Sequence, residues 1–196
     1  GAAVPSPTLG NGVAGCKLAD GRVFVCETST ARIYSPATNT WASVYPPPVY
    51  ATERAVSLLG DGRVLVCGGF YGGVPINSVR IYNPTTDTWS AALANLPNAK
   101  YLHKAKTLGD GSVLVVGGVS ASAALSEVHV YNPTANVWTA KASLPTAKYS
   151  MGIAMLLDGR VLVTGGYDSS NTFAEAHVYS ASADSWTPVA SLPVGV

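Results

Sequence analysis

The residues in this chain best suited to binding a ligand are lysines and tyrosines that occur as adjacent pairs. Lys100-Tyr101 and Lys148-Tyr149 lie 48 residues apart, and each pair follows an alanine and a nearby proline. A lysine ammonium beside a tyrosine hydroxyl can hold a carboxylate, a sugar or a peptide backbone. The recurrence of the pair at one place in the chain predicts a shared binding surface.

Residues that could carry out catalysis are scattered. Asp61, Asp110 and Asp158 belong to turns, where each precedes a glycine, and the glutamates are isolated, so no pair of carboxylates is predicted to act as acid and base. No Ser-His-Asp arrangement and no phosphate-binding glycine loop is found. We expect no catalytic residues and no cofactor.

The metal-binding potential of the chain is equally low. His129 and His177 are 48 residues apart, and arginine holds the equivalent positions Arg32 and Arg80. A position that accepts both residue types favours the surface of a strand over a metal ligand. His103 has no partner histidine, and the segment from Asp168 to Asn171 has too few carboxylates for a dedicated calcium site. No metal site is predicted.

The elements that position these residues form a repeat. Four tryptophans lie at spacings of 48, 49 and 48 residues: Trp41, Trp89, Trp138 and Trp186. Asp-Gly dipeptides recur at intervals of 41, 49 and 48 residues, of which only the first is short, and a proline precedes each of them by 13 residues: Pro7, Pro48, Pro97 and Pro145. A period near 50 is long enough for one small antiparallel sheet. We predict one domain, 1–196, with units over about 7–47, 48–96, 97–144 and 145–193.

The second unit shows four expected strands. Residues 54–59 and 63–67 flank Asp61-Gly62, which is a strong signal for a two-residue hairpin turn. Gly68-Gly69 ends the second strand, 78–82 form the third, and Asn83-Pro84-Thr85 is a turn before the fourth at 88–90. This is the pattern of a β-propeller blade, which buries its faces only against neighbouring blades.

Strand order sorts the connections onto two faces. The Asp-Gly and Asn-Pro-Thr turns fall at one end of each unit, and the loops after Gly-Gly fall at the other end with the links around each proline. We name this second end the loop face and predict that it binds the ligand. Phe70, Asn171 and Phe173 belong to it, and the predicted ligand-binding residues are Arg54, Tyr71, Lys100, Tyr101, His103, Lys148, Tyr149, Tyr167 and Asp168. The alternative for any single residue is structural, as a cover for a blade edge or a solvated loop tip.

The paired glycines, the later tyrosine and the following tryptophan, here Gly68-Gly69, Tyr82 and Trp89, resemble the kelch repeat over nearly the whole chain. The segment 158–166 is most similar to kelch propellers of secreted bacterial and galactose-oxidase-like proteins. The resemblance implies an all-β propeller, which the repeats of this chain would build from four four-stranded blades, and a secreted or extracellular location, with the cytoplasm as an alternative. The copper site of galactose-oxidase-like enzymes, with two histidines, two tyrosines and a crosslinked cysteine, has no counterpart in this sequence.

The first unit departs from the kelch pattern. Cys26-Glu27-Thr28 stands where Gly-Gly is expected, and the following loop is about seven residues shorter. Kelch proteins usually carry six or seven blades, and an open arc of four leaves apolar terminal faces exposed. A closed four-bladed ring is the favoured expectation, with two alternatives: half of an eight-bladed ring made by two chains, or part of a larger propeller.

Composition excludes two classes of partner. Charged residues are 12% of the chain and the net charge is +1, with no run of lysine or arginine, so nucleic acid is not an expected partner. The longest apolar runs are strand-sized, so membrane insertion is not expected.

Three cysteines cannot all pair within one chain. A two-residue turn at Asp20-Gly21 puts Cys16 opposite Val25, which places Cys16 and Cys26 on opposite sheet faces, so that disulfide is not expected. Cys26 and Cys67 hold equivalent places in apolar strands, and we expect both to be small buried thiols.

The leading functional hypothesis is a non-catalytic binding module that presents its loop face to a protein, peptide or glycan. One alternative is an enzyme of the sugar-oxidising or sugar-isomerising type found among kelch relatives. Another is a scaffold that assembles through its terminal blades, with a homodimer as one form.

Overall fold

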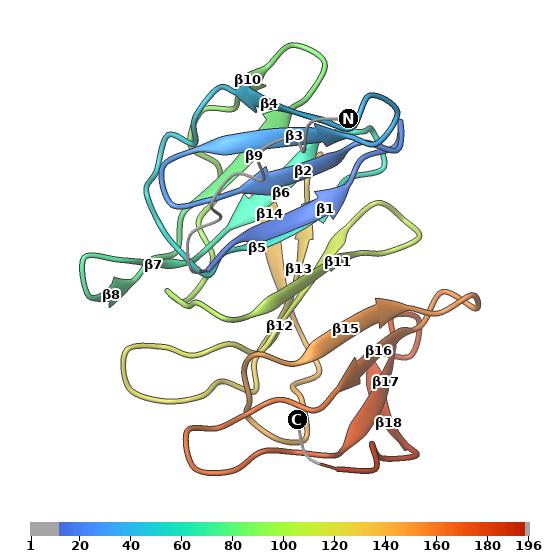
Figure 1. Cartoon of the computed structure of the whole chain (residues 1–196). Coiled ribbons are helices and arrows are strands. Elements are labelled where there is room, and N and C mark those ends of the chain that lie inside the picture. Colours follow the sequence, from blue (N-terminus) through green and yellow to red (C-terminus); the bar gives the residue numbers. More distant parts are fainter. Residues whose placement is uncertain (1–11, 195–196) are drawn as a thin grey trace.

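The computed structural model describes residues 12–194, and every regular element among them is a β-strand. Pro7 and the start of the first predicted unit lie outside the described residues. Within the described part, no helix is long and apolar enough to cross a membrane. The strands form four four-stranded antiparallel sheets and one small hairpin (Figure 1).

Each sheet corresponds to one predicted blade. Blade one contains β1 (Ala14–Lys17), β2 (Val23–Cys26), β3 (Ala31–Ser35) and β4 (Thr40–Val44). Blade two contains β5 (Ala55–Leu58), β6 (Val64–Cys67), β9 (Val79–Asn83) and β10 (Thr88–Trp89), and its loop carries β7 (Phe70–Tyr71) and β8 (Val74–Pro75). Blade three contains β11 (Lys104–Thr107), β12 (Val113–Val116), β13 (Val128–Asn132) and β14 (Val137–Lys141). Blade four contains β15 (Gly152–Met155), β16 (Val161–Thr164), β17 (Ala176–Ser180) and β18 (Ser185–Val189). The order within each blade follows the chain, so β1, β5, β11 and β15 are edge strands.

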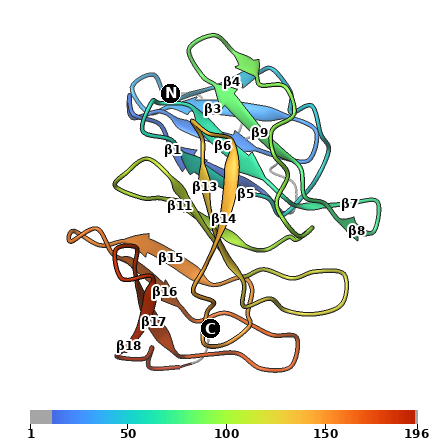
Figure 2. The same cartoon turned by 180° about the vertical axis from the view of Figure 1, so that it is seen from behind.

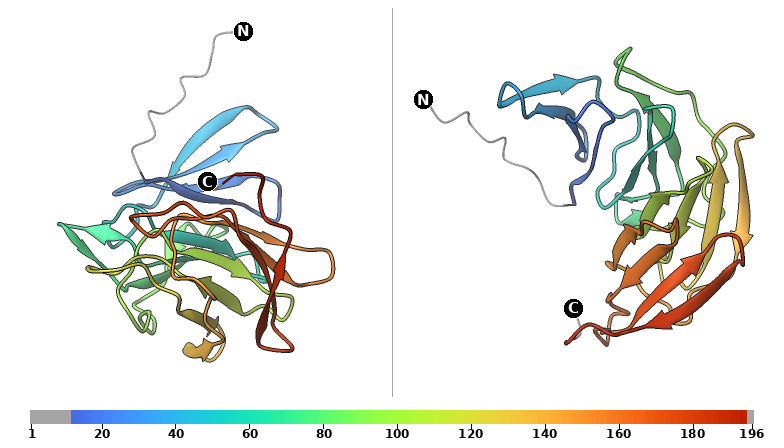
Figure 3. Two further views of the ribbon diagram at one scale, coloured as in Figure 1. Left: turned by 90° about the horizontal axis from the view of Figure 1, so that it is seen from below. Right: turned by 90° about the vertical axis from the view of Figure 1, so that its right-hand side faces the viewer.

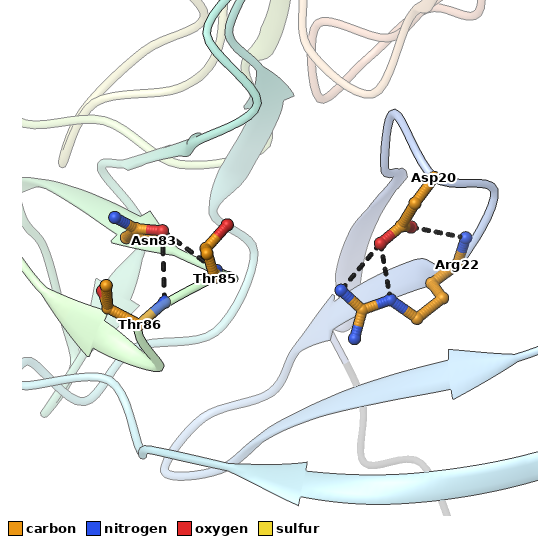
Figure 4. A network of polar contacts seen from close by, with 5 residues as sticks. All are labelled: Asp20, Arg22, Asn83, Thr85 and Thr86. Carbon is orange, nitrogen blue, oxygen red and sulfur yellow. Dashed lines mark hydrogen bonds and ion pairs between the residues drawn. The ribbon is translucent and has the colours of Figure 1, made fainter.

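The Asp-Gly turns are one residue longer than predicted. Lys17 pairs with Val23, Leu18 N donates to Arg22 O at 2.7 Å, and Gly21 has φ of 89°. This is a three-residue loop with a glycine bulge. The Asp20 carboxylate accepts hydrogen bonds from the backbone N–H and the Nε of Arg22, at 3.0 and 2.8 Å, and so holds the turn (Figure 4). The predicted two-residue turn is therefore wrong.

This extra residue changes the position of Cys16. It lies opposite Phe24, so it shares a sheet face with Cys26, and the predicted placement on opposite faces is wrong. Cys16 and Cys26 nevertheless remain free thiols, as does Cys67. Cys26 and Cys67 are buried as predicted, and burial raises the pKa of the Cys67 thiol to about 12. These thiols are protonated at neutral pH.

The turns before the fourth strands also follow their sequence. Asn83 Oδ1 accepts hydrogen bonds from the backbone N–H groups of Thr85 and Thr86, at 2.9 and 3.4 Å (Figure 4). Asn132 makes the same pair of contacts in blade three. A short polar side chain that bonds to the backbone two residues ahead favours a turn over a continued strand.

The hydrophobic core is divided into three clusters, and each lies between two successive blades. Phe24 and Ile33 of blade one pack with Val64 and Tyr82 of blade two, and the rings of Phe24 and Tyr82 are 4.9 Å apart. Equivalent clusters join blade two to blade three and blade three to blade four. A blade thus contributes one sheet face to each neighbour, and no blade has a core of its own.

A repeated set of hydrogen bonds, which we name the interblade clamp, fastens successive blades. Trp89 Nε1 donates to Tyr45 O at 2.9 Å, and Tyr45 N donates to Asp87 Oδ1 at 2.8 Å. The same Asp87 oxygen accepts from the hydroxyl of the buried Tyr82 at 2.8 Å. The other two clamps are Trp138–Ala94–Asn136 and Trp186–Ala142–Asp184. The tryptophans that mark the repeat are therefore contacts between blades.

A second series of contacts, the axial ladder, links residues just before the first strand of each blade. We call these first strands, β1, β5, β11 and β15, the inner strands. Glu53 N donates to Gly12 O, Leu102 N donates to Glu53 O, and Ser150 N donates to Leu102 O, at 3.0 to 3.1 Å. All four residues have positive φ, between 55° and 77°. One residue of left-handed backbone per blade thus redirects the chain at the axis.

The four blades form an open arc. Inner strand β5 lies against β1 on one side and β11 on the other, and β11 also lies against β15. Figure 3 shows that blades one and four stay apart, and Figure 2 shows blade four below the others from behind. The favoured closed four-bladed ring is not the observed arrangement, because closure by four blades needs a quarter turn at each junction. Side chains as large as Tyr82, Tyr131 and Tyr179 fill these junctions and are completely buried there.

Replacement of Asn136 tests the clamp. Asn136→Gly keeps the left-handed backbone but removes the acceptor for Tyr131 Oη and Ala94 N, so we expect the free energy of unfolding to fall by about 2–4 kcal/mol. Asn136→Asp is the matched control and should cost less than about 1 kcal/mol, since aspartate holds this position in blades two and four. Urea denaturation measures both, and a fully stable glycine variant would contradict the clamp.

Candidate functional site

The loop face is built by contacts between each proline link and the loop of its own blade. Thr52 and Phe70 form an antiparallel bridge, with N···O distances of 3.0 and 2.9 Å, and Tyr101–Val119 and Tyr149–Tyr167 repeat it. The prediction that links and Gly-Gly loops share one face is confirmed. The glycines permit this approach: Gly118 has φ of 102°, and a Cβ there would lie 2.7 Å from His103 Cβ.

Blade one has a shorter loop after its second strand. Four residues join β2 to β3, whereas 11 join β6 to β9, so the predicted difference of seven residues is confirmed. Glu27 N closes the short loop by donating to Thr30 O at 2.9 Å. The loop face is therefore formed mainly by blades two to four.

Aromatic side chains gather on this face in pairs, and we name them together the aromatic rim. The rings of Phe70 and Tyr101 are 4.7 Å apart, and those of Tyr149 and Tyr167 meet edge to face at 5.3 Å. Tyr71 pairs with Tyr50, which the sequence prediction did not include. Tyr50 and Tyr71 are each 53% exposed. Of the predicted residues, Tyr149 and Tyr167 pair with each other, whereas Tyr71 and Tyr101 pair with Tyr50 and Phe70.

The two predicted lysines lie inside the protein. Lys100 and Lys148 are fully buried and form ion pairs with Glu127 and Glu175, and the Lys148 pair has an N···O distance of 3.0 Å. Burial lowers the pKa of Lys100. Burial also opposes ionisation of Glu127, but its hydrogen bond and attraction to Lys100 outweigh that effect and hold the pKa of Glu127 below its ordinary value. Neither ammonium group is accessible to a surface ligand.

Arg54 and His103 hold equivalent positions between blades and are also buried. The Arg54 guanidinium donates to Thr28 O at 3.1 Å and to Cys26 Sγ at 2.9 Å, so it ties blade two to the short loop of blade one. His103 Nε2 lies 3.5 Å from Cys67 Sγ. Burial lowers the pKa of His103 to about 3, so the imidazole is neutral at physiological pH.

Asp168, the last of the predicted residues, forms hydrogen bonds with the backbone of its own loop. Its Oδ1 accepts hydrogen bonds from Ser170 N and Asn171 N at 2.9 and 2.7 Å. Among residues 12–194, no three His, Cys, Asp or Glu side chains are grouped to hold a metal ion. The expected surface position of His129 and His177 is wrong, because both are buried in the third strands of their blades, 8% and 7% exposed.

A groove of about 680 Å³ runs along the inner strands, and we name it the axial groove. Residues of β1, β5 and β11 line it, together with Ile153 of β15. Its charged lining residues are all cationic: Lys17, Lys104, Lys106 and the largely buried Arg54. Its volume is within the range of small-ligand sites. The groove can therefore attract a carboxylate or another anion.

Sequence reasoning missed the three groove lysines. Lys104 and Lys106 flank the buried Ala105 in β11, so alternation along the strand places both on the sheet face opposite to that of Ala105. This alternation is the sequence signal that could have placed the two lysines on one sheet face. Nothing in the sequence identified that face as the wall of a groove, because the groove exists only when neighbouring blades come together.

Four blades of four antiparallel strands, arranged around an axial groove, define a β-propeller architecture. The family model described as the kelch motif matches residues 53–92, 103–145 and 154–193. The chain belongs to the kelch-repeat family. The first blade lies outside these matches, in keeping with its divergent sequence.

Comparison with solved structures supports the same architecture. The chain is similar to the protein in "Structure of YjhT", with a TM-score of 0.83 and 16% sequence identity, over 98% of this chain and 70% of that one. At this identity the likeness shows the fold alone. No curated protein sequence matches the chain.

The buried ion pairs can be tested against blade two, where Ala51 and Ser78 replace the lysine and the glutamate. Lys100→Ala removes the partner of Glu127 and should lower the free energy of unfolding by about 3 kcal/mol. The double variant Lys100→Ala/Glu127→Ser should cost less than the single one, because no carboxylate is left without its cation. Chemical denaturation of both variants measures the difference. Unchanged stability in Lys100→Ala would favour a ligand-binding role instead.

His103 gives a test by pH. Its pKa is lowered on folding, so the folded state binds fewer protons than the unfolded state between pH 6.5 and about 3. Stability is therefore expected to fall as the pH is lowered through this range, by up to about 1.4 kcal/mol per pH unit from this residue. His103→Met, which copies the equivalent Met151 of blade four, should reduce the slope. Chemical denaturation of the parent chain and the variant at pH 7 and pH 5 measures the loss of stability between these two values. An equal loss in the two proteins would contradict the buried neutral imidazole.

Proposed function

We propose that this kelch propeller is a binding module whose axial groove and aromatic rim hold an acidic segment of a protein or peptide. The observation that carries the proposal is the positive charge of the groove, to which Lys17, Lys104 and Lys106 contribute. Ammonium groups in a concave site attract carboxylates more strongly than on a flat surface, because the walls exclude part of the solvent.

The backbone of the groove supports a peptide ligand. Its walls are edge strands, which retain backbone N–H and C=O groups without partners in their own sheet. An extended peptide can bond to such groups while its acidic side chains reach the lysines. Polar side chains are also present, since Ser57 Oγ and Thr107 Oγ1 lie in the lining, 2.8 Å apart.

The aromatic rim favours a second candidate, an acidic glycan. Tyr101 and Tyr149 each precede an inner strand by three residues, so the rim lies at the loop-face end of the strands that line the groove. Exposed tyrosine rings can pack on the apolar faces of sugars while their hydroxyls hydrogen-bond to them. A secreted or extracellular location remains part of the proposal.

Binding is tested with two fluorescent probes, a glutamate-rich decapeptide and a uronic acid oligosaccharide. The variant Lys104→Gln/Lys106→Gln should weaken binding of the correct probe by about tenfold or more and should reduce its salt dependence. Lys141→Gln is the matched control, because Lys141 lies on outer strand β14, away from the groove. Fluorescence anisotropy measures both effects.

Each outcome separates the candidates. Binding of the peptide alone supports the leading proposal, and binding of the oligosaccharide alone supports the second. Equal weakening by Lys141→Gln would indicate nonspecific attraction, and no binding of either probe would contradict an acidic ligand.

A further inference from the structure

The first blade carries one half of an interblade clamp. Asn39 holds the position of Asp87, with φ of 54°, and its Oδ1 accepts a hydrogen bond from Tyr34 Oη at 2.8 Å. The rings of Tyr34 and Trp41 are 5.1 Å apart, as are those of Tyr82 and Trp89. Within residues 12–194, however, no backbone N–H donates to Asn39 Oδ1 and no carbonyl accepts from Trp41 Nε1. The clamp is assembled but lacks the peptide group it holds elsewhere.

The surrounding sheet face is also uncovered. Tyr34 is partly exposed, whereas its three counterparts, Tyr82, Tyr131 and Tyr179, are completely buried. Val23 is partly exposed too, whereas its counterpart Val64 is buried in the junction between blades one and two. This face therefore has the composition of a blade junction, but no blade formed by residues 12–194 packs on it.

The fourth blade carries the complementary half. Ala190 follows Ala142 by 48 residues and holds the position whose peptide group is bound in each clamp. It is exposed. Three leucines of this blade are partly exposed although their counterparts Leu108, Leu114 and Leu144 are buried in the preceding junction: Leu156, Leu162 and Leu192. The axial ladder likewise ends on this blade at Ser150 and begins on blade one at Gly12.

We propose that blade four of one copy docks on blade one of a second copy, so that two copies close an eight-bladed ring. The open halves match residue by residue: Trp41 Nε1 donates to Ala190 O, Ala190 N donates to Asn39 Oδ1, and Gly12 N donates to Ser150 O. These are the contacts that the chain makes at its own three junctions. The proposal is independent of the binding function.

A second copy fits this interface because the chain carries both halves on opposite ends of one arc. Two copies related by a twofold axis form two identical junctions and leave no end open. Eight blades lie within the range of known propellers. The arrangement also covers the apolar terminal faces of a chain with only 12% charged residues.

The mass in solution tests the ring. Analytical ultracentrifugation of the full chain over a dilution series should give twice the 20.1 kDa of one chain, with dissociation at low concentration. A monomer at all concentrations would overturn the proposal, since it leaves the terminal faces open or closes them within one chain. Assemblies that grow with concentration would also overturn it, because they show head-to-tail contacts that do not close.

Two substitutions test the clamp between copies. Asn39→Gly and Ala190→Pro remove the acceptor and the donor of the same hydrogen bond, and each should weaken the dimer about tenfold or more, since the bond occurs twice per ring. The dimer of the double variant should dissociate about as readily as the less stable of the two single-variant dimers, because the two changes remove the same interaction.

Asn136→Gly is the matched control, since it makes the same change at a junction within the chain. It should lower stability and leave the dimer dissociation constant unchanged. An Ala190→Pro variant that associates as tightly as the parent chain would overturn the head-to-tail contact.

Discussion

Everything in this fold depends on the fact that a blade cannot bury its two faces alone. Each hydrophobic cluster lies between neighbours, and at each junction one peptide group is held by a tryptophan indole and by an Asn or Asp oxygen. The same oxygen also satisfies a fully buried tyrosine hydroxyl. The Asn or Asp side chain at this position lies in a turn and accepts hydrogen bonds from both the core tyrosine and the neighbouring blade. The position therefore needs a short hydrogen-bond acceptor that tolerates a left-handed backbone conformation.

The same dependence explains how charge is distributed. Lys100, Lys148 and Arg54 lie in the interior, where ion pairs or backbone carbonyls satisfy them. Lys104 and Lys106 remain free to meet a ligand because their strand lies at an edge of its sheet, next to the axis. In this protein, structural cations and candidate ligand-binding cations are separated by as few as four positions in the chain. Their types alone do not distinguish them.

Much of the fold could be predicted because it is encoded locally. The strands of blade two, the loop face and the shortened loop of blade one follow from turn residues and from strand-sized apolar runs. The errors arose where a local signal was incomplete. One additional residue in the turn at Asp20 moved Cys16 to the other sheet face, and His129 and His177 were expected on a surface although both are buried in the third strands of their blades. For the candidate site, the sequence placed four tyrosines on the loop face, where the structure holds them in aromatic pairs, but it did not indicate the groove lysines.

The sequence by itself determined the number of blades, the order of their strands and the end at which the variable loops gather, because a period of 48 or 49 residues and fixed turn chemistry act within each unit. Only the tertiary structure decided which lysines are buried, where the groove lies and whether the arc closes. These properties depend on how blades pack on one another, because the side chains of each hydrophobic cluster come from two blades rather than from any one repeat.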